Sequence, residues 1–489
     1  MNRVLGVRLC RNVAASLRPT ITAQPLTVAP VGHCQPLTTT AATEPCVAIV
    51  GAGPAGFYTA QQIIKRTPGC RVDLFERLPA PFGLVRYGVA PDHPEVKNVE
   101  HSFSQTAALP GVRLLADVTV GEHVSVAELR AAYDAVVLAY GADQERSLGI
   151  PGEELANVTS ARRLVGWYNG LPGCPAPADL SAEHAVIIGM GNVALDVLRI
   201  LTAPLDMLKE TDITENALSA LAESRIRHVT VVGRRGPLQA AFTIKELREQ
   251  LQLPGVTALW DDFPADQLEK QLPDLPRPRR RLTELMVKAA RDRRSPADGR
   301  RSWSLRFLRS PLEAHGDAAG RVAELRLAVN RLDGDKVAAT GETERLPCQL
   351  LITSTGYKGQ SIDPDLPFDA DRGVIPNTNG RVTGIPGVYA TGWIGTGPVG
   401  VIVSTMTASF GVGRLVSDDL AAGRLGGRSS EPDQLLETIR SRGVRPVGFA
   451  DWLRLDEAET ERGRQTGAPR QKVTSVEEMR RIIWAERDQ

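Results

Sequence analysis

The chain has 489 residues, 42% of them hydrophobic and 24% charged, and a formal net charge of +1. That length exceeds what one ordinary core accommodates, so we expect two or three domains in a soluble globular protein. The near-zero charge excludes a general attraction to nucleic acid or acidic membranes. After residue 43, no stretch reaches the ~20 apolar residues that a membrane-spanning helix requires.

Residues 1–43 differ from the rest of the chain because they carry arginines but no acidic residue. These arginines stand among many serines, threonines and alanines, at Arg3, Arg8, Arg11 and Arg18. This composition is typical of a mitochondrial transit peptide. An N-terminal tail with an accidental charge bias is the less favoured alternative.

The apolar run 46–50 is followed by glycines with the spacing of a dinucleotide-binding turn: Gly51, Gly53 and Gly56. A helix is expected to begin near Pro54, and the next strand-like run, 71–75, leads to Glu76. In such a unit the glycines let a pyrophosphate approach the helix N-terminus, while the acid binds free ribose hydroxyls. We therefore expect FAD here, with a purely structural glycine turn as the alternative.

A second unit begins at residue 185, and its turn has the same spacing: Gly189, Gly191 and Ala194. The following strand, 228–232, leads to Arg234 and Arg235. Guanidinium groups match phosphate oxygens in pairs, so this unit is expected to bind the 2′-phosphate of NADPH. A solvated basic turn is the alternative. Glu246 either orients the cofactor or the arginines, or is an acid on a surface helix.

The hydrophobic pattern predicts further strands at 136–141, 322–331, 350–356 and 387–392. It also predicts short helices at 206–209 and 217–222 and a buried helix at 401–415. We predict an α/β fold with two Rossmann-like dinucleotide-binding domains, as in the glutathione-reductase class of flavoproteins. The NADPH domain is inserted into a discontinuous FAD domain. The predicted divisions are a transit peptide at 1–43, FAD domain at 44–142 and 357–489, and NADPH domain at 143–356.

A basic region occupies residues 277–309, with twelve lysines or arginines against three acids. In a chain of near-zero net charge, such a local field suits an acidic partner. A solvated arginine-rich loop remains an equal alternative on composition. Nucleic acid is less favoured, because aromatic residues for base stacking do not alternate with the arginines.

The chain resembles the mitochondrial NADPH:adrenodoxin oxidoreductases, or adrenodoxin reductases, a family of mitochondrial-type ferredoxin–NADP reductases. The most specific stretches are 160–170 (SARRLVGWYNG), 191–196 (GNVALD), 231–239 (VVGRRGPLQ) and 241–248 (AFTIKELR). The resemblance covers residues 46–482. It implies electron transfer from NADPH through FAD to an acidic [2Fe–2S] ferredoxin that serves mitochondrial cytochromes P-450 and iron–sulfur cluster assembly. It also implies a location in the mitochondrial matrix, free or peripheral on the inner membrane.

The resemblance implies FAD contacts at Ala55, Glu76, Leu84, Val120, Trp393, Gly400, Val401 and Ile402. It implies NADPH contacts at Met190, Gly191, Asn192, Val193, Arg234, Arg235, Glu246 and Gly400. A docking face for the ferredoxin is implied at Arg248, Arg277 and Arg281. His93 and Asp196 fall near the flavin and nicotinamide, where a proton-handling role is a hypothesis.

Two positions depart from the family pattern. A Lys-Arg pair usually follows the tryptophan at position 393, and here Gly395 and Thr396 stand in its place. The second glycine turn usually holds glutamine where this chain has Met190. Both departures are expected to affect cofactor affinity and turnover more than the reaction itself.

Four other functions share parts of this pattern. A glutamate-synthase-like subunit would add a cysteine-rich iron–sulfur module, and a disulfide reductase would need paired cysteines near the flavin. The six cysteines show neither pattern nor metal-ligand spacing, and we expect buried reduced thiols. A small-molecule NADPH-dependent flavin reductase and a catalytically impaired nucleotide-binding homologue remain alternatives.

Overall fold

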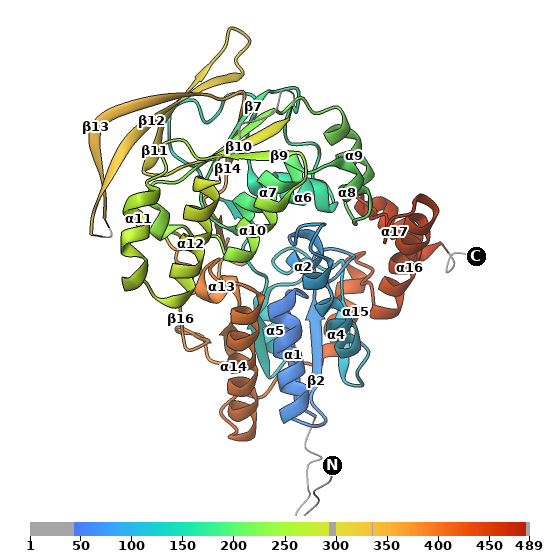
Figure 1. The fold of residues 1–489 in the computed structure, drawn as a ribbon. Helices are drawn as coiled ribbons and strands as arrows, with labels where there is room; N and C mark the ends of the chain where they lie inside the picture. Colours follow the sequence, from blue (N-terminus) through green and yellow to red (C-terminus); the bar gives the residue numbers. More distant parts are fainter. Residues whose placement is uncertain (1–43, 293–299, 335, 486–489) are drawn as a thin grey trace, which may run out of the picture. The chain divides into compact units, whose positions relative to one another are not determined.

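The computed structural model describes residues 44–292, 300–334 and 336–485, and the predicted transit peptide at 1–43 lies outside them. Within these residues the strands form two large sheets and two small ones (Figure 1). No helix of the described residues is long and apolar enough to cross a membrane.

The first large sheet has seven strands, and its central part is parallel. Its strands, in spatial order, are β16 (Asn377–Thr378), β17 (Arg381–Val382), β18 (Val388–Ala390), β4 (Ala135–Leu138), β1 (Cys46–Val50), β2 (Arg71–Phe75) and β3 (Val112–Leu115). The C-terminal strand β18 therefore pairs with β4, and the sheet combines two segments far apart in sequence.

The second large sheet has six strands, all paired in parallel. Their spatial order is β6 (Val158–Ser160), β14 (Leu350–Thr353), β7 (His184–Ile188), β8 (His228–Val232), β10 (Arg301–Arg306) and β9 (Val256–Leu259). The whole sheet is built from residues that lie between β4 and β18 in the sequence.

The two chain segments that connect the large sheets pair with each other. β5 (Gln144–Glu145) and β15 (Tyr357–Lys358) form a short antiparallel ladder. A separate antiparallel sheet joins β11 (Arg309–Gly316), β12 (Val322–Asp333) and β13 (Lys336–Pro347), and Figure 1 shows its long strands in yellow at the upper left. The sequence pattern predicted only the middle strand of that sheet.

The helices fall into three groups along the chain. Those in the segments of the seven-stranded sheet are α1 (Pro54–Arg66), α2 (Leu84–Tyr87), α3 (Pro94–Lys97), α4 (Val99–Ala107), α5 (Val126–Ala132), α13 (Trp393–Thr396) and α14 (Ile402–Ala421). Those in the segment of the six-stranded sheet are α6 (Ala161–Asn169), α7 (Asn192–Thr202), α8 (Leu205–Lys209), α9 (Glu215–Ala222), α10 (Ile244–Gln252), α11 (Ala265–Gln271) and α12 (Arg277–Arg291), with 3₁₀ turns η1 (Pro237–Gln239) and η2 (Leu272–Asp274). The C-terminal group comprises α15 (Pro432–Ser441), α16 (Phe449–Thr466) and α17 (Val476–Trp484).

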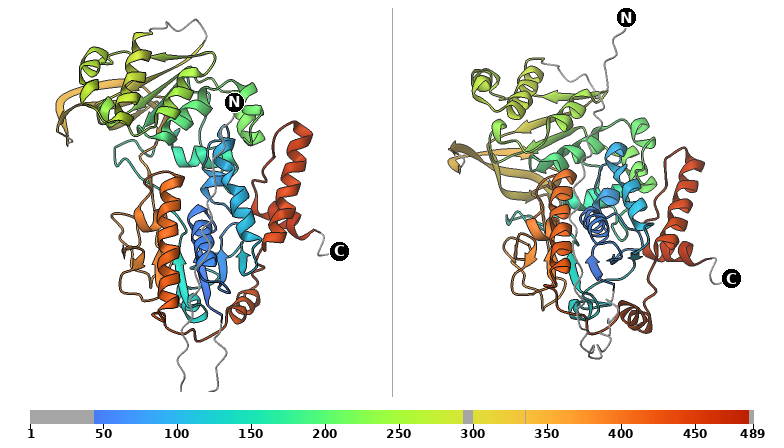
Figure 2. Two further views of the ribbon diagram at one scale, coloured as in Figure 1. Left: turned by 60° about the horizontal axis from the view of Figure 1, so that its bottom comes forward. Right: turned by 90° about the horizontal axis from the view of Figure 1, so that it is seen from below.

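The first sheet is buried on both faces, because successive side chains of a strand point to opposite sides. In β1, Val47 and Ile49 join one apolar cluster, and Ala48 and Val50 join another on the opposite face. Helices α1 and α14 run side by side on the first of these faces (Figures 1 and 2). A helix of the second half of the chain thus lies against the first glycine-turn helix.

The predicted α/β fold class is confirmed, and most predicted elements are present near their expected positions. One expectation was wrong, and so was one of the alternatives, the arginine-rich loop. The helix predicted at 401–415 extends to Ala421, and its first turn is not buried, since Val403 is 60% exposed. The basic stretch from Arg277 is a helix, α12, rather than a loop. Part of the basic region, 293–299, lies outside the described residues.

The four described cysteines are free thiols. Cys46, Cys70 and Cys348 are buried as expected, whereas Cys174 is only half-buried. Burial raises the pKa of Cys70 and of Cys348 to about 12, so both are neutral thiols at physiological pH.

Candidate functional site

The first glycine turn has the tight geometry that its sequence predicted. Gly51 has φ 109°, and a Cβ there would lie 2.6 Å from the carbonyl oxygen of Ala139, so a side chain would collide with the neighbouring strand's end. Gly53 is the N-cap of α1, with no side-chain cap, and the nearest atom to a Cβ there is 3.9 Å away. The helix N-terminus therefore offers uncapped N–H groups beside open space, which suits a pyrophosphate.

Glu76 is fixed beside this turn by two backbone amides. Its Oε2 accepts from the N–H of Ala52 at 3.1 Å, and its Oε1 accepts from the N–H of Leu78 at 3.1 Å. Burial raises the pKa of this carboxyl group. Each oxygen keeps a further lone pair, so the group can still accept from a ribose hydroxyl.

The chain's C-terminal part returns to this turn. A Cβ at Gly392 would lie 2.7 Å from the Cβ of Ala55, which places the start of α13 against the start of α1. The next residue, Trp393, stacks on Tyr357 with ring centroids 5.7 Å apart. The loop that follows exposes apolar residues: Val399 is 77% and Val401 53% exposed.

The remaining predicted flavin contacts differ in exposure. Leu84 is 40% exposed at the start of α2, and Val120 is buried. Gly400 is exposed with φ 91°, and Ile402 is half-buried at the first position of α14. These placements leave Leu84 and Gly400 accessible to a ligand.

The second glycine turn repeats the geometry of the first. Gly189 has φ 136°, and a Cβ there would lie 2.2 Å from the carbonyl oxygen of Ser354. Gly191 is the uncapped N-cap of α7, and no atom lies within 4 Å of a Cβ built on it. Asn192 and Val193 form the first turn of α7, and the Asn192 Oδ1 accepts from the N–H of Thr243 at 2.8 Å.

The side chain of Met190 lies in apolar surroundings. Its methyl carbon would lie 2.7 Å from a Cβ at Gly233, so the side chain covers the end of β8 and packs against the core. Its carbonyl oxygen accepts from the N–H groups of Ala241 and Phe242, at 2.9 and 3.1 Å. The backbone thus ties the loop after η1 to the glycine turn.

Arg234 and Arg235 are exposed at the end of β8. Their backbones are held, since the carbonyl oxygen of Arg234 accepts from Asn330 and that of Arg235 from the N–H of Leu308. Within the described residues, neither side chain forms an ion pair. Both guanidinium groups are therefore free to bind an anion.

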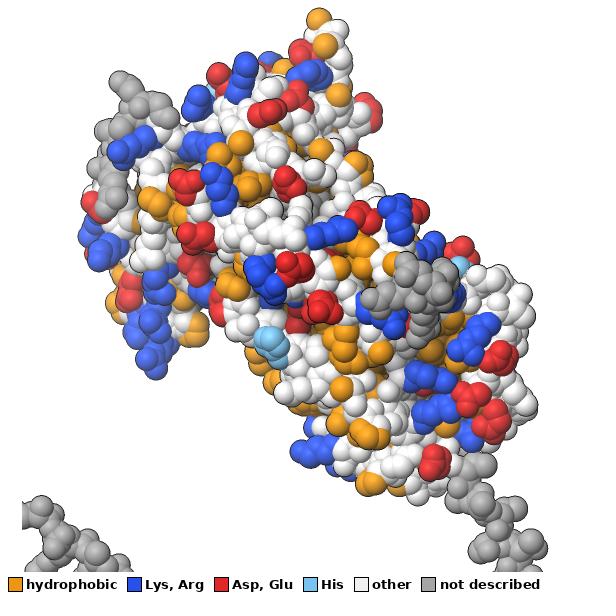
Figure 3. Space-filling view, turned by 90° about the vertical axis from the view of Figure 1, so that its right-hand side faces the viewer, with side chains coloured by type: hydrophobic (Ala, Val, Ile, Leu, Met, Phe, Trp, Pro, Cys, Tyr) orange, Lys and Arg blue, Asp and Glu red, His pale blue; other side chains and the backbone are white. Residues whose placement is uncertain are grey.

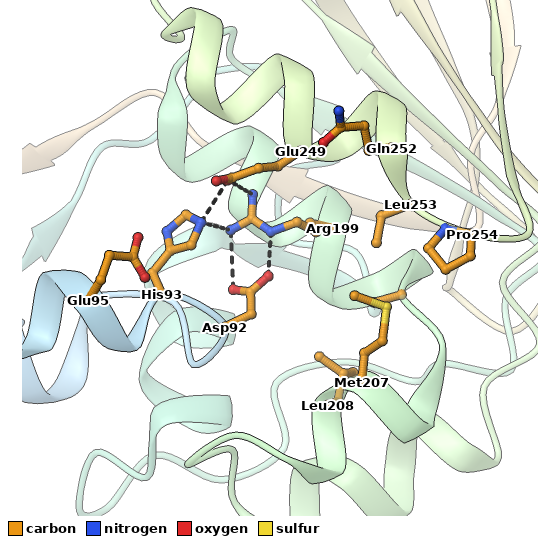
Figure 4. Close-up of a pocket in the computed structure, with 11 residues that line it drawn as sticks. Asp92, His93, Glu95, Arg199, Met207, Leu208, Glu249, Gln252, Leu253 and Pro254 are labelled. Atoms are coloured by element: carbon orange, nitrogen blue, oxygen red, sulfur yellow. Dashed lines mark hydrogen bonds and ion pairs between the residues drawn. The ribbon is translucent and has the colours of Figure 1, made fainter.

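A buried cluster of charged groups surrounds Arg199, which is 3% exposed (Figure 4). Its Nε lies 2.5 Å from Asp92 Oδ2, its Nη2 lies 2.7 Å from Asp196 Oδ1, and its Nη1 lies 3.1 Å from Glu246 Oε2. The structure thus brings the predicted residues Asp196 and Glu246 together around a guanidinium that the sequence analysis missed. An arginine within the apolar helix pattern of residues 195–201 was the available signal.

His93 lies at the edge of the same cluster. Its Nε2 is 2.8 Å from Glu249 Oε2 and 3.1 Å from Arg199 Nη2. The contact with Glu249 requires a proton on this nitrogen, whereas the contact with the guanidinium requires its lone pair. The two contacts therefore exclude each other, and the tautomer of the ring decides which of them forms.

Glu246 is buried, so the interpretation as a surface acid is wrong. Its hydrogen bond is to Arg199. Burial, followed by the nearby charge of Asp196, raises the pKa of Glu246 to about 7. Burial also raises the pKa of Asp196. Burial thus favours the protonated form of both acids.

Ligand atoms of His93, Asp196 and Glu246 lie within 4.8 Å of one another, a spacing compatible with a metal ion. The guanidinium of Arg199 contacts all three and already provides their positive partner. A cavity of about 400 Å³ opens next to the cluster (Figure 4). Its charged wall is Asp92, His93, Arg199 and Glu249, and its apolar wall is Met207, Leu208, Leu253 and Pro254.

The three residues predicted for partner docking are exposed on two helices that pack together. Arg248 lies on α10, and Arg277 and Arg281 lie four residues apart on α12, hence on one face. None of them forms an ion pair within the described part of the chain. On the face that Figure 3 shows, acidic and basic side chains are interspersed.

Comparison with known proteins places this geometry in a family. The family description "Pyridine nucleotide-disulphide oxidoreductase" matches residues 45–261. The mouse mitochondrial NADPH:adrenodoxin oxidoreductase is 51% identical over 465 residues, covering 92% of this chain and 94% of that protein. The Arabidopsis thaliana protein of the same name is 40% identical, covering 88% and 94%.

A solved structure, Mycobacterium tuberculosis FprA in complex with NADPH, matches with a TM-score of 0.83. It is 39% identical, and the match covers 90% of this chain and 99% of that one. Sequence identities of 39–51% over about nine-tenths of the chain establish membership of the same family. The chain therefore belongs to the NADPH:adrenodoxin oxidoreductase family.

Proposed function

We propose that this chain is a flavoprotein that passes electrons from NADPH through FAD to an acidic [2Fe–2S] ferredoxin. The observation that carries the proposal is the pair of glycine turns, whose units end in residues of opposite charge. Each has an uncapped helix N-terminus beside open space, yet the first is followed by Glu76 and the second by the unpaired Arg234 and Arg235. One chain is thus suited to two dinucleotides that differ at a ribose 2′ position.

Residues from both ends of the chain would hold FAD. The backbone N–H groups of the first turn of α1, after Gly53, would face the pyrophosphate. Glu76 would accept a hydrogen bond from a ribose hydroxyl, and Trp393 would lie near the flavin ring. A hollow of about 440 Å³ is lined by Arg77 and Leu78, the two residues after Glu76, and by Thr119 among others, and it would take the adenosine portion. When bound, FAD accepts two electrons together and releases them singly.

NADPH would be held by the second unit. The N-terminus of α7 would face its pyrophosphate, and the free guanidinium groups of Arg234 and Arg235 would bind its 2′-phosphate. Met190 contributes its backbone to this site while its side chain packs inward.

The buried cluster would handle a proton. Oxidation of NADPH by one-electron carriers leaves one proton, and His93 Nε2 and Glu246 Oε2, 3.9 Å apart, can hold it. The pKa of Glu246 near 7 suits such exchange at neutral pH. Asp196 and Arg199 would keep these two groups in position.

The distribution of charged residues supports both the proposed partner protein and the proposed location in the cell. Arg248, Arg277 and Arg281 present unpaired positive charge that would steer an acidic ferredoxin. The acid-free composition of residues 1–43 and the word "mitochondrial" in the relatives' names support a location in the mitochondrial matrix. We further propose that the reduced partner serves mitochondrial cytochromes P-450 and iron–sulfur cluster assembly.

The proposed division into an FAD domain (44–142 and 357–489) and an inserted NADPH domain (143–356) is supported by the strand order. All strands of the six-stranded sheet lie within 143–356, and the connecting segments meet in the β5–β15 ladder. Relatives that are 50–51% identical and are named as adrenodoxin oxidoreductases favour this function over a glutamate-synthase-like subunit or an impaired homologue.

Two measurements on the purified protein test the proposal. The visible absorption spectrum should show bound flavin that is bleached by NADPH. Cytochrome c should then be reduced rapidly only when a [2Fe–2S] ferredoxin is added. A colourless protein that cannot be reconstituted with FAD would refute the flavoprotein function, and equal cytochrome c reduction without ferredoxin would refute the partner.

A further inference from the structure

Arg279 occupies a distinct position at the start of α12. Arg277 and Arg281 are exposed, whereas Arg279, between them in sequence, is half-buried. Its Nη1 donates to the carbonyl oxygen of Ala240 at 2.7 Å. Arg279 therefore points toward the protein, and not toward the proposed docking face.

The acceptor of this hydrogen bond belongs to the loop that shapes the second nucleotide site. Ala240 ends the η1 turn, which begins two residues after Arg235. The following residue, Ala241, donates its N–H to the carbonyl oxygen of Met190 in the glycine turn. One short loop thus connects Arg279, the arginine pair and the glycine turn.

The charge around Arg279 is not balanced by an acid. Burial, followed by the positive charge of Arg235, lowers the pKa of Arg279, and the hydrogen bond to Ala240 places the Arg279 guanidinium on the loop that follows Arg235. Within the described residues, neither group forms an ion pair. Nearby arginines of the same region do have acidic partners: Arg280 with Glu284, Arg291 with Glu269, Arg306 with Asp262 and Arg309 with Glu344.

We propose that Arg279 is a third guanidinium for the 2′-phosphate of the nicotinamide dinucleotide, and that it helps the protein select NADPH over NADH. This inference rests on the proposed use of NADPH. Arg279 has one N–H group engaged with Ala240, and its other donors can meet a phosphate oxygen. A phosphate dianion would offset the repulsion between Arg235 and Arg279, which no side chain offsets in the described structure.

The test compares two ligands that differ only by the 2′-phosphate, adenosine 2′,5′-bisphosphate and adenosine 5′-monophosphate. Their dissociation constants are measured by calorimetry on the flavin-loaded protein and on Arg279→Met. We expect the bisphosphate to bind roughly 10- to 100-fold more weakly to the variant, the range for one lost charged hydrogen bond. Binding of the monophosphate should not change. Arg279→Lys should recover part of the difference, because it restores the charge without the planar fork.

Arg280→Met is the matched control, since Arg280 is on the same turn, is 43% exposed and pairs with Glu284. It should alter neither dissociation constant. Equal weakening of both ligands by Arg279→Met would show that Arg279 only supports the loop, and unchanged bisphosphate binding would also overturn the inference. If the unmodified protein itself bound both ligands equally, the proposed use of NADPH would fail instead.

Discussion

Asp92 and Arg199 form a two-point ion pair that joins the two nucleotide-binding halves of the chain. Arg199 donates through Nε and Nη2 to the two carboxylate oxygens of Asp92, at 2.5 and 3.2 Å. Asp92 belongs to the segment before α3, and Arg199 lies in α7. Further ion pairs connect the same segments: Glu95 with Lys245 and Lys97 with Asp212, both at 2.6 Å. Ionic contacts therefore set the position of one half against the other.

Replacing Arg199 with methionine should destabilise the protein strongly. The change leaves the carboxylates of Asp92, Asp196 and Glu246 without their shared cation, and removal of one partner from a buried ion pair typically costs about 3–5 kcal/mol. Urea unfolding followed by circular dichroism measures the loss. Lys209→Met, which breaks an exposed pair with Asp206, should cost less than about 1 kcal/mol. Similar costs for the two variants would contradict the importance of the buried cluster.

Glu246→Gln should change how stability depends on pH. The pKa of Glu246 is raised to about 7, so between its ordinary value near 4.5 and about 7 the folded state retains a proton that the unfolded state releases. Stability from this group is thus full at low pH and decreases as pH rises through that window. The unfolding free energy of the unmodified protein, relative to Glu246→Gln, should fall from pH 4.5 to pH 7 and then level off. Glu284→Gln, at a half-exposed position paired with Arg280, is the control for removing a carboxylate from the chain.

Arg235→Ala should weaken binding of NADPH far more than binding of NADH. The variant loses a free guanidinium at the end of β8, and a lost charged hydrogen bond corresponds to roughly 1.5–3 kcal/mol. Stopped-flow titration of flavin reduction with each cofactor gives the two affinities. An equal decrease for NADPH and NADH would argue against contact with the 2′-phosphate.

Charge reversal at Arg277 and Arg281 should impair only the step that involves the partner. The double variant to glutamate places negative charge on an exposed helix face where neither arginine forms an ion pair in the described structure, and an acidic ferredoxin would be repelled. The KM for ferredoxin should increase at least tenfold, while NADPH-dependent dye reduction stays unchanged. A double reversal at Arg440 and Arg464, on other helices, makes the same charge change and should leave the KM as it was. Loss of dye reduction in the first variant would rule out a pure docking role.

Restoring positive charge at Gly395 and at Thr396, which together form the first departure from the family pattern, should have unequal results. Thr396 is exposed, so Thr396→Arg should fold normally and bind NADP⁺ more tightly at low salt, by about 0.5–1 kcal/mol. Gly395 has less space, because a Cβ there would lie 3.1 Å from the backbone of Ala390, and Gly395→Lys should lower the melting temperature. Melting curves and NADP⁺ titrations at two salt concentrations measure both effects. A salt-independent gain from Thr396→Arg would contradict an electrostatic cause.

The sequence alone predicted the two nucleotide units because their signals are local. A tight turn at Gly51 or Gly189, an uncapped helix start and the charge after the next strand all lie within about 50 residues of chain and depend on backbone conformation. The structure therefore has these turns and helix starts where the pattern put them. It also explains Met190, whose side chain packs over Gly233, a contact that no spacing rule indicates.

What only the tertiary structure decided is the arrangement around Arg199 and Arg279. Asp92 and Arg199 are 107 residues apart in the sequence. Their contact therefore depends on how the two sheets and their helices pack, and not on residues that neighbour either one in the sequence. Likewise, α12 carries several arginines in sequence, but packing directs Arg279 inward and leaves Arg277 and Arg281 exposed. Composition gives the number of charged residues. Tertiary packing determines which of them form ion pairs, because it brings together residues that are far apart in the sequence and buries them in one place.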